Sequence, residues 1–140
     1  MEDLKQSSKQ FTSNLPPTLD PVLSWFDRLN QPYIPQKVWL QCQLAIAEGF
    51  TNAVRHAHKN LSPDLPVDIE VNISLHQLEI RIWDQGPPFD LEGKIQELLQ
   101  RGEHLGGSGR GILILRRIAD RLSYIRTDDD RNCLLIVKYY

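Results

Sequence analysis

The sequence predicts an α+β fold: a two-layer α/β sandwich, with helices on one face of a mixed, mostly antiparallel sheet. Apolar and polar residues alternate from Val67 to Leu75 and again from Leu78 to Trp83, as in two strands that each bury one face. The segment from about Pro35 to Lys59 instead repeats its apolar residues at helical spacing. A sheet with one apolar face is expected to carry its helices on that face.

Length and composition indicate one ordinary globular domain spanning residues 1–140. The apolar fraction is 41% and the charged fraction 24%, and the net charge of −2 gives no general attraction to nucleic acid or to an anionic membrane. Cys42 and Cys133 are far apart in apolar runs, so we expect two buried free thiols rather than a disulfide or a metal site. The start of the chain is polar and no apolar run approaches a membrane span, so a cytoplasmic protein is expected.

The remaining elements are shorter and are separated by turn residues. The polar N-terminus is either a loose lead-in or a short edge strand that ends near Leu15. Asp20-Pro21 is a favourable helix start, with an N-cap residue followed by proline. Three further segments are expected as a short helix, a helix that starts near Gly109 or Arg110, and a final hairpin: 91–100, 109–122, and 123–126 with 132–139.

The long helix carries three polar residues at a regular interval. Glu48, Asn52 and His56 are four residues apart, so on a helix they stack on nearly one line beside the apolar stripe. An asparagine oxygen can bind magnesium, and a carboxylate one turn away can accept a proton from an attacking hydroxyl. The alternative is a solvated polar edge. His56 is interpreted mainly as a structural histidine and His58 as a surface residue.

Two glycine-containing segments follow downstream. At the end of the second strand, the carboxylate of Asp84 can accept a hydrogen bond from a base amine, and Gly86 would let the backbone approach a flat ring. The alternative is an ordinary strand-end turn. The run from Gly106 to Gly111 precedes an apolar helix, so it offers backbone N–H groups and a helix N-terminus to a phosphate. A flexible hinge is the alternative there.

In this order the three segments resemble a known family. The pattern is similar to the N, G1 and G2 boxes of the Bergerat-fold (GHKL) ATPases, which include gyrase and the histidine kinases. Its residues are Glu48-xxx-Asn52-Ala53-xx-His56, Asp84-x-Gly86-xx-Phe89-Asp90 and Gly109-x-Gly111. The resemblance covers about Pro35 to Tyr140. The spacing and the apolar run from Ile112 to Leu115 are most similar to the RsbW/SpoIIAB group of anti-sigma factor serine kinases.

The resemblance implies a role for each matching residue. Glu48 would be the general base and Asn52 the ligand of magnesium bound with ATP. Asp84 would contact the adenine, with Gly86 beside it. Residues 91–108, which have few apolar anchors, would form a lid over the phosphates. The phosphate side would be lined by Gly107, Ser108, Gly109, Arg110 and Gly111.

The function implied by the resemblance is ATP-dependent serine/threonine phosphorylation of a small antagonist. That partner would be an anti-anti-sigma protein of the STAS type, and the chain would also sequester a sigma factor. Members of the group often dimerise, so a homodimer is one expected assembly, with no direct contact to nucleic acid or membrane. The alternative is a non-catalytic module that binds its partner in response to ATP. The catalytic domain of a histidine kinase is less favoured, because too few residues precede Pro35 for a phosphoacceptor hairpin.

Overall fold

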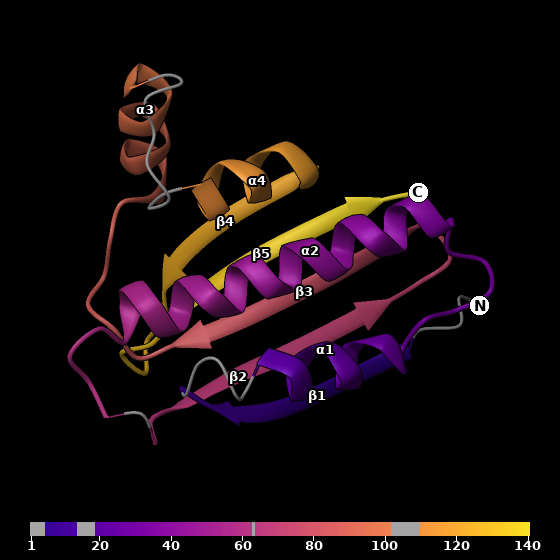
Figure 1. Ribbon diagram of the computed structural model, residues 1–140, viewed down its shortest axis with the longest axis horizontal. Helices are drawn as coiled ribbons and strands as arrows, with labels where there is room; N and C mark the ends of the chain where they lie inside the picture. Colours follow the sequence, from indigo (N-terminus) through magenta and orange to yellow (C-terminus); the bar gives the residue numbers. More distant parts are fainter. Residues whose placement is uncertain (1–4, 14–18, 63, 102–109) are drawn as a thin grey trace.

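The computed structural model describes residues 5–13, 19–62, 64–101 and 110–140. Five strands form one sheet in the order β1-β2-β3-β5-β4, and each pairing between neighbours is antiparallel (Figure 1). The strands are β1 (Lys5–Thr12), β2 (Pro66–Ile73), β3 (Gln77–Asp84), β4 (Arg121–Arg126) and β5 (Asn132–Tyr139).

The described helices lie on one side of this sheet, apart from α3, which stands beyond α4 at the edge of the molecule (Figure 1). α2 is the longest and runs along the middle of the sheet, with α1 and α4 on either side of it. This arrangement confirms the predicted α+β two-layer sandwich. The helical elements are α1 (Leu19–Asp27), α2 (Gln36–Asn52), the π-helical turn η1 (Ala53–Ala57), α3 (Leu91–Arg101) and α4 (Arg110–Ile118).

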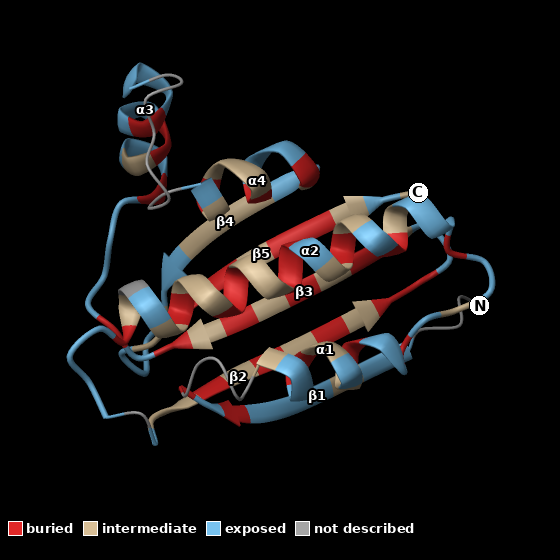
Figure 2. Ribbon diagram, in the orientation of Figure 1, coloured by how far each residue is buried: buried red, intermediate tan, exposed pale blue. Residues whose placement is uncertain are grey.

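The predicted alternation in the two central strands is confirmed, because every second residue of β2 and β3 is buried (Figure 2). Ile69 pairs with Ile82 and Val71 with Ile80, so the apolar residues of both strands share the helix-facing side. Gly49 lets α2 approach this surface closely, since a Cβ atom there would lie 2.5 Å from Ile82 Cδ1. The core therefore forms between α2 and the middle of the sheet.

The N-terminal segment is a strand rather than a loose lead-in. Every residue of β1 pairs with β2, from Lys5 opposite Ile73 to Thr12 opposite Pro66. Most β1 side chains are exposed, as expected of an edge strand, and Lys9 is among them. Phe11 is the buried residue of this strand and contacts the rings of Trp25 and Phe50 edge-on.

The predicted long helix is continuous in direction but changes its hydrogen bonding near its end. α2 stops at Asn52, and in η1 the amide of His58 donates to the carbonyl of Ala53, five residues back, at 2.8 Å. Such wide turns occur mostly as single insertions in helices, frequently at functional sites. The extra residue per turn shifts the direction of the residues that follow Asn52 relative to a regular helix.

Both cysteines are free and buried, as the sequence predicts. Burial raises the pKa of the Cys42 thiol to about 12 and also raises that of Cys133, so both stay protonated near neutral pH. No helix among the described residues is long and apolar enough to cross a membrane.

Candidate functional site

The site is built around Asp84, the last residue of β3, whose side chain is 2% exposed. Its Oδ1 accepts hydrogen bonds from the amide of Gly86 at 3.0 Å and from Asn132 Nδ2 at 2.8 Å. Its Oδ2 accepts one from the hydroxyl of Tyr124 at 2.7 Å. A carboxylate oxygen has two lone pairs, so Oδ1 is saturated and Oδ2 has one acceptor position left.

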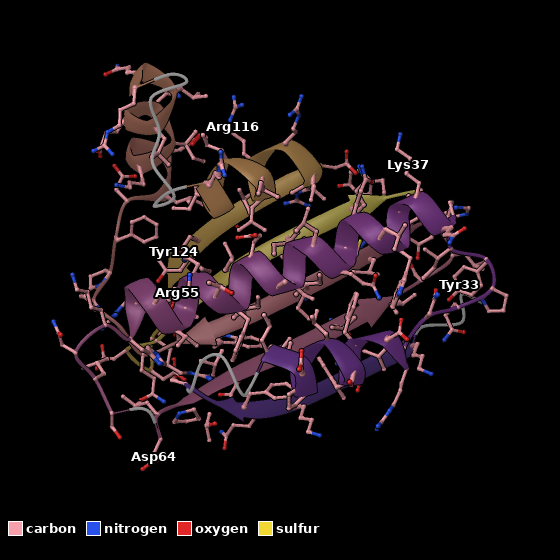
Figure 3. The ribbon with its side chains drawn as sticks, viewed as in Figure 1. Tyr33, Lys37, Arg55, Asp64, Arg116 and Tyr124 are labelled. Carbon is pink, nitrogen blue, oxygen red and sulfur yellow. The ribbon has the colours of Figure 1, made fainter. Side chains whose placement is uncertain are left out.

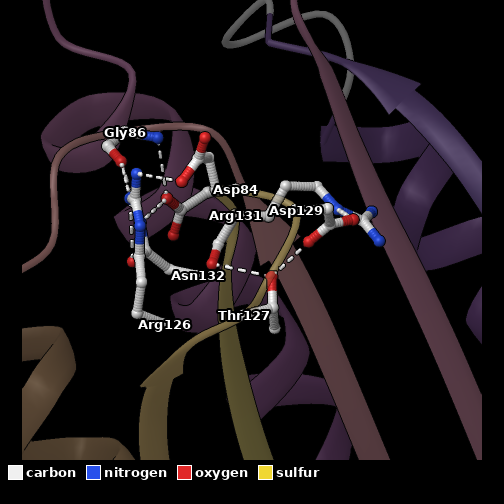
Figure 4. A network of polar contacts seen from close by, with 8 residues as sticks. Asp84, Gly86, Arg126, Thr127, Asp129, Arg131 and Asn132 are labelled. Carbon is white, nitrogen blue, oxygen red and sulfur yellow. Dashed lines mark hydrogen bonds and ion pairs between the residues drawn. The ribbon is translucent and has the colours of Figure 1, made fainter.

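Two side chains from the last hairpin hold the backbone that follows Asp84 (Figure 4). The carbonyl of Gly86 accepts from Asn132 Nδ2 at 3.0 Å and from Arg126 Nη1 at 2.9 Å. Asn132 reaches both groups because it pairs directly with Asp84 in the β3–β5 ladder, and it is 1% exposed. The amide therefore ties the carboxylate and the turn into one unit.

Gly86 is also placed against the end of the long helix. A Cβ atom at this position would overlap the carbonyl oxygen of Ala57, the last residue of η1. The structure thus gives a reason for glycine here that the sequence did not suggest, since the close neighbour is the protein's own backbone. The turn after β3 and the π-helical turn are packed together without a side chain between them.

The prediction that His58 lies on the surface is wrong, because this residue is only 4% exposed. Its Nε2 accepts a hydrogen bond from the amide of Gln85 at 2.7 Å, and its Nδ1 lies 2.6 Å from Ser13 Oγ. The π-helical turn directly before it changes its direction, which helical periodicity does not anticipate. Burial lowers the pKa of His58, and the charge of Asp84 opposes that shift.

Tyr124 approaches the site from β4 (Figure 3). Burial, with the hydrogen bond to Asp84, raises the pKa of its hydroxyl well above the usual range, so it remains a donor. Its ring meets Phe89 edge-on, with 4.9 Å between centroids. Sequence reasoning missed Tyr124, Arg126 and Asn132. Asn132 alone carried a signal, as a lone amide at the start of an apolar strand.

The predicted base and metal ligand lie on α2, and both Glu48 and Asn52 are half-buried. A Cβ atom at Gly111 would overlap Glu48 Oε2, so the carboxylate lies against the first turn of α4. Arg110 begins that helix and is exposed. The structure therefore brings together the acidic residue of the first predicted segment and the end of the third.

Part of the predicted site lies outside the described residues, namely Gly107, Ser108 and Gly109. Within the predicted lid the structure describes α3, which confirms the expected short helix. This helix has more apolar anchors than we expected, because Leu91, Ile95 and Leu98 are buried. The side chain of His56 is not described.

The described geometry is that of a two-layer α/β sandwich with the carboxylate of Glu48 beside the first turn of α4. Comparison with known proteins gives the family. The family described as "Histidine kinase-like ATPase domain" matches residues 12–138. The chain therefore belongs to this family of ATPase domains.

Part of the chain is also similar to individual proteins. Over 83 residues the chain is 31% identical to the serine-protein kinase RsbW of Listeria innocua, covering 56% of this chain and 52% of that protein. Over 85 residues it is 32% identical to RsbW of Bacillus licheniformis, covering 57% and 53%. The chain thus spans about half the length of these relatives.

A solved structure extends the similarity to nearly the whole fold. The SiaB–SiaC complex of Pseudomonas aeruginosa contains a chain that aligns with a TM-score of 0.60, covering 96% of this chain and 89% of that one. The sequence identity is 11%, so this likeness concerns the fold alone.

Proposed function

We propose that this protein is an ATP-dependent serine/threonine protein kinase. Its substrate would be a small anti-anti-sigma protein of the STAS type. A second partner, which it would sequester without phosphorylating, would be a sigma factor. The observation that carries the proposal is the contact between the Glu48 carboxylate and Gly111 at the start of α4. Membership of the ATPase-domain family and the similarity to RsbW kinases support it.

The Glu48–Gly111 contact suits phosphoryl transfer for a physical reason. A helix N-terminus attracts phosphate through its free N–H groups and its dipole. A carboxylate beside that helix end would then lie near the point at which a hydroxyl attacks the terminal phosphate. The hydroxyl oxygen would bond to the γ-phosphorus, its proton would pass to Glu48, and the bond to the β–γ bridging oxygen would break to release ADP.

A magnesium ion would enter this site together with the nucleotide. They contain no cluster of three or more His, Cys, Asp or Glu side chains that would hold a metal without a nucleotide. Magnesium on a nucleotide needs only one or two protein oxygens, because phosphates and water complete its octahedron. The amide oxygen of Asn52 would be that ligand. The ion would neutralise charge on the phosphates during transfer.

On the base side, Asp84 would receive the exocyclic amine of adenine through the acceptor position that remains on Oδ2. Gly86 would lie beside the base. Residues 107–111 would line the phosphates, and residues 91–108 would close over them as a lid. The proposed setting is the cytoplasm, and a homodimer is the proposed assembly.

The test is phosphoryl transfer from γ-labelled ATP to STAS-domain proteins encoded near this chain in its genome. We expect labelled serine or threonine on one of these STAS-domain proteins. Only the unphosphorylated form of that protein should release the sigma factor from this chain. ATP binding and partner capture without transfer to any candidate would contradict the kinase. That result would favour the alternative, a module that binds its partner in response to ATP.

A further inference from the structure

A histidine supports the backbone turn that is proposed to contact the adenine of the nucleotide. The amide of Gln85, between Asp84 and Gly86, donates to His58 Nε2 at 2.7 Å. On the other side of the ring, Nδ1 lies 2.6 Å from Ser13 Oγ. His58 is 4% exposed, so neither bond can be replaced easily by water.

The hydrogen bonds define the state of this imidazole. A backbone amide is only a donor, so Nε2 must be the unprotonated, accepting nitrogen. The neutral ring then carries its hydrogen on Nδ1 and donates it to Ser13 Oγ. The serine hydroxyl in turn donates a hydrogen bond to the carbonyl of Leu65, at 2.7 Å. Every donor in this series of hydrogen bonds has an acceptor when the ring is neutral.

Protonation of the His58 ring breaks this series of hydrogen bonds between His58 and Gln85. With a hydrogen on Nε2, two donors would face each other across the short distance between His58 and Gln85, and the turn would have to move. Among the described groups, the carboxylate of Asp84 at the end of β3 is the charge that acts on the ring, and it favours the imidazolium. The other hydrogen-bonding groups on this side carry no charge. Ser13, just after β1, contacts the ring, and Leu65, just before β2, accepts from Ser13.

We infer that His58 is a positioning residue for the nucleotide site. By accepting from Gln85, neutral His58 holds Asp84 and Gly86 in the arrangement that receives the base, and its protonation weakens nucleotide binding. This inference rests on the proposed function, since it assumes that the Asp84–Gly86 turn contacts a nucleotide. It gives the chain a pH dependence that originates outside the groups that touch the ligand.

The direction of the effect follows from the environment of the ring. Burial lowers the pKa of His58 in the folded protein, from about 6.5 in an unfolded chain. The neutral, supporting form is therefore present at pH 7.5 and is lost as the pH falls through the folded pKa, below about 6.5. Nucleotide binding should be full in neutral and weakly alkaline solution and should weaken in acid.

Two substitutions distinguish the contributions of the two ring nitrogens. His58→Gln places an amide oxygen near the position of Nε2, so it can accept from Gln85 but cannot titrate. His58→Asn places its amide near the position of Nδ1, so it can reach Ser13 but leaves Gln85 without an acceptor. The dissociation constant of a non-hydrolysable ATP analogue is measured for the wild type and both variants at pH 7.5 and pH 5.

We expect His58→Gln to bind as the wild type does at pH 7.5, and His58→Asn to bind more weakly. One linked proton changes affinity by up to about tenfold per pH unit. The wild type should therefore lose at least about threefold more affinity than His58→Gln on going to pH 5. Titration of the nucleotide affects both proteins alike, so the ratio isolates His58.

The inference is overturned if the wild type and His58→Gln lose affinity equally. A measurement on the wild type alone covers the case in which His58→Gln does not fold. In nuclear magnetic resonance spectra of the free protein, the Gln85 amide should shift with the His58 ring over the same pH range, and an amide that does not follow the ring also overturns the inference. Absence of analogue binding at both pH values would instead overturn the proposed function, and with it this inference.

Discussion

The two ends of the candidate site differ in how far the protein itself occupies their polar groups. At the base end, Asp84 and the carbonyl of Gly86 already hold hydrogen bonds from Tyr124, Asn132 and Arg126. At the phosphate end, the side chains of Glu48, Asn52 and Arg110 form no hydrogen bond or ion pair with any other described residue. The protein itself thus occupies most polar groups of the base end, whereas these three side chains of the phosphate end have no such partner among the described residues.

Two glycines show the same difference in packing. A Cβ atom at Gly86 would overlap backbone, the carbonyl of Ala57, which cannot rotate away. A Cβ atom at Gly111 would overlap the carboxylate of Glu48, the far end of a flexible side chain. The same added methyl group should thus strain the fold at the base end and displace only a functional group at the phosphate end.

The largest expected effect is therefore on stability, from Gly86→Ala. Moving backbone to admit the methyl group should lower the free energy of unfolding by about 3 kcal/mol. Gly111→Ala is the matched control and should change stability by less than about 1 kcal/mol, because alanine favours the helix while Glu48 rotates away. Urea unfolding of both variants tests this, and equal losses would remove the contrast between the two ends.

Asp84→Asn tests the base end of the site through nucleotide binding. The amide that replaces one oxygen brings donors to a buried place where three donors already point, and it removes the charge that would hold the adenine amine. We expect ATP binding to weaken by about 1–3 kcal/mol in calorimetry. Asp64→Asn, at an exposed loop residue, should bind normally. Equal affinity of the wild type for ATP and GTP would contradict the adenine assignment.

A smaller effect is expected at the phosphate end from Asn52→Ala. If the amide oxygen binds magnesium, the variant should lose affinity for ATP with magnesium, by about 1 kcal/mol, and lose little without it. Titrations with and without the metal measure this, and circular dichroism checks that the fold is intact. Identical losses under both conditions would indicate a general defect in place of a lost ligand.

The smallest change concerns dynamics in α3. Its three buried side chains anchor the helix, so hydrogen exchange there should be slowed by ATP only moderately. Exchange across residues 91–101, measured by mass spectrometry with and without nucleotide, tests the lid. Protection that is complete before nucleotide is added, or unchanged after it, would contradict closure over the phosphates.

Local patterns in the sequence predict most of the fold. The alternation in β2 and β3 and the apolar spacing of α2 are set by which face is buried, so period alone identifies these elements. The π-helical turn was not predictable in this way, because it changes hydrogen bonding without interrupting the helical pattern. This single turn explains why His58 was wrongly assigned to the surface.

The candidate site was predictable only where one segment carries its own signal. Glu48 and Asn52 share a helix face, and Gly111 belongs to a glycine-rich run, so each could be singled out. The partners of Asp84 come from β4 and β5, some forty to fifty residues later. Their positions depend on the register between β3 and β5, which one sequence does not determine.

The central claim is that Glu48 acts as the base in phosphoryl transfer, and single-turnover transfer by Glu48→Gln tests it most directly. The amide keeps the shape of the side chain but cannot take the proton, so transfer should be at least about 10²-fold slower while ATP and partner affinities stay unchanged. Glu79→Gln, at one of the less buried positions that alternate with the core residues of β3, is the matched control and should transfer normally. Transfer at the wild-type rate by Glu48→Gln would contradict the assignment.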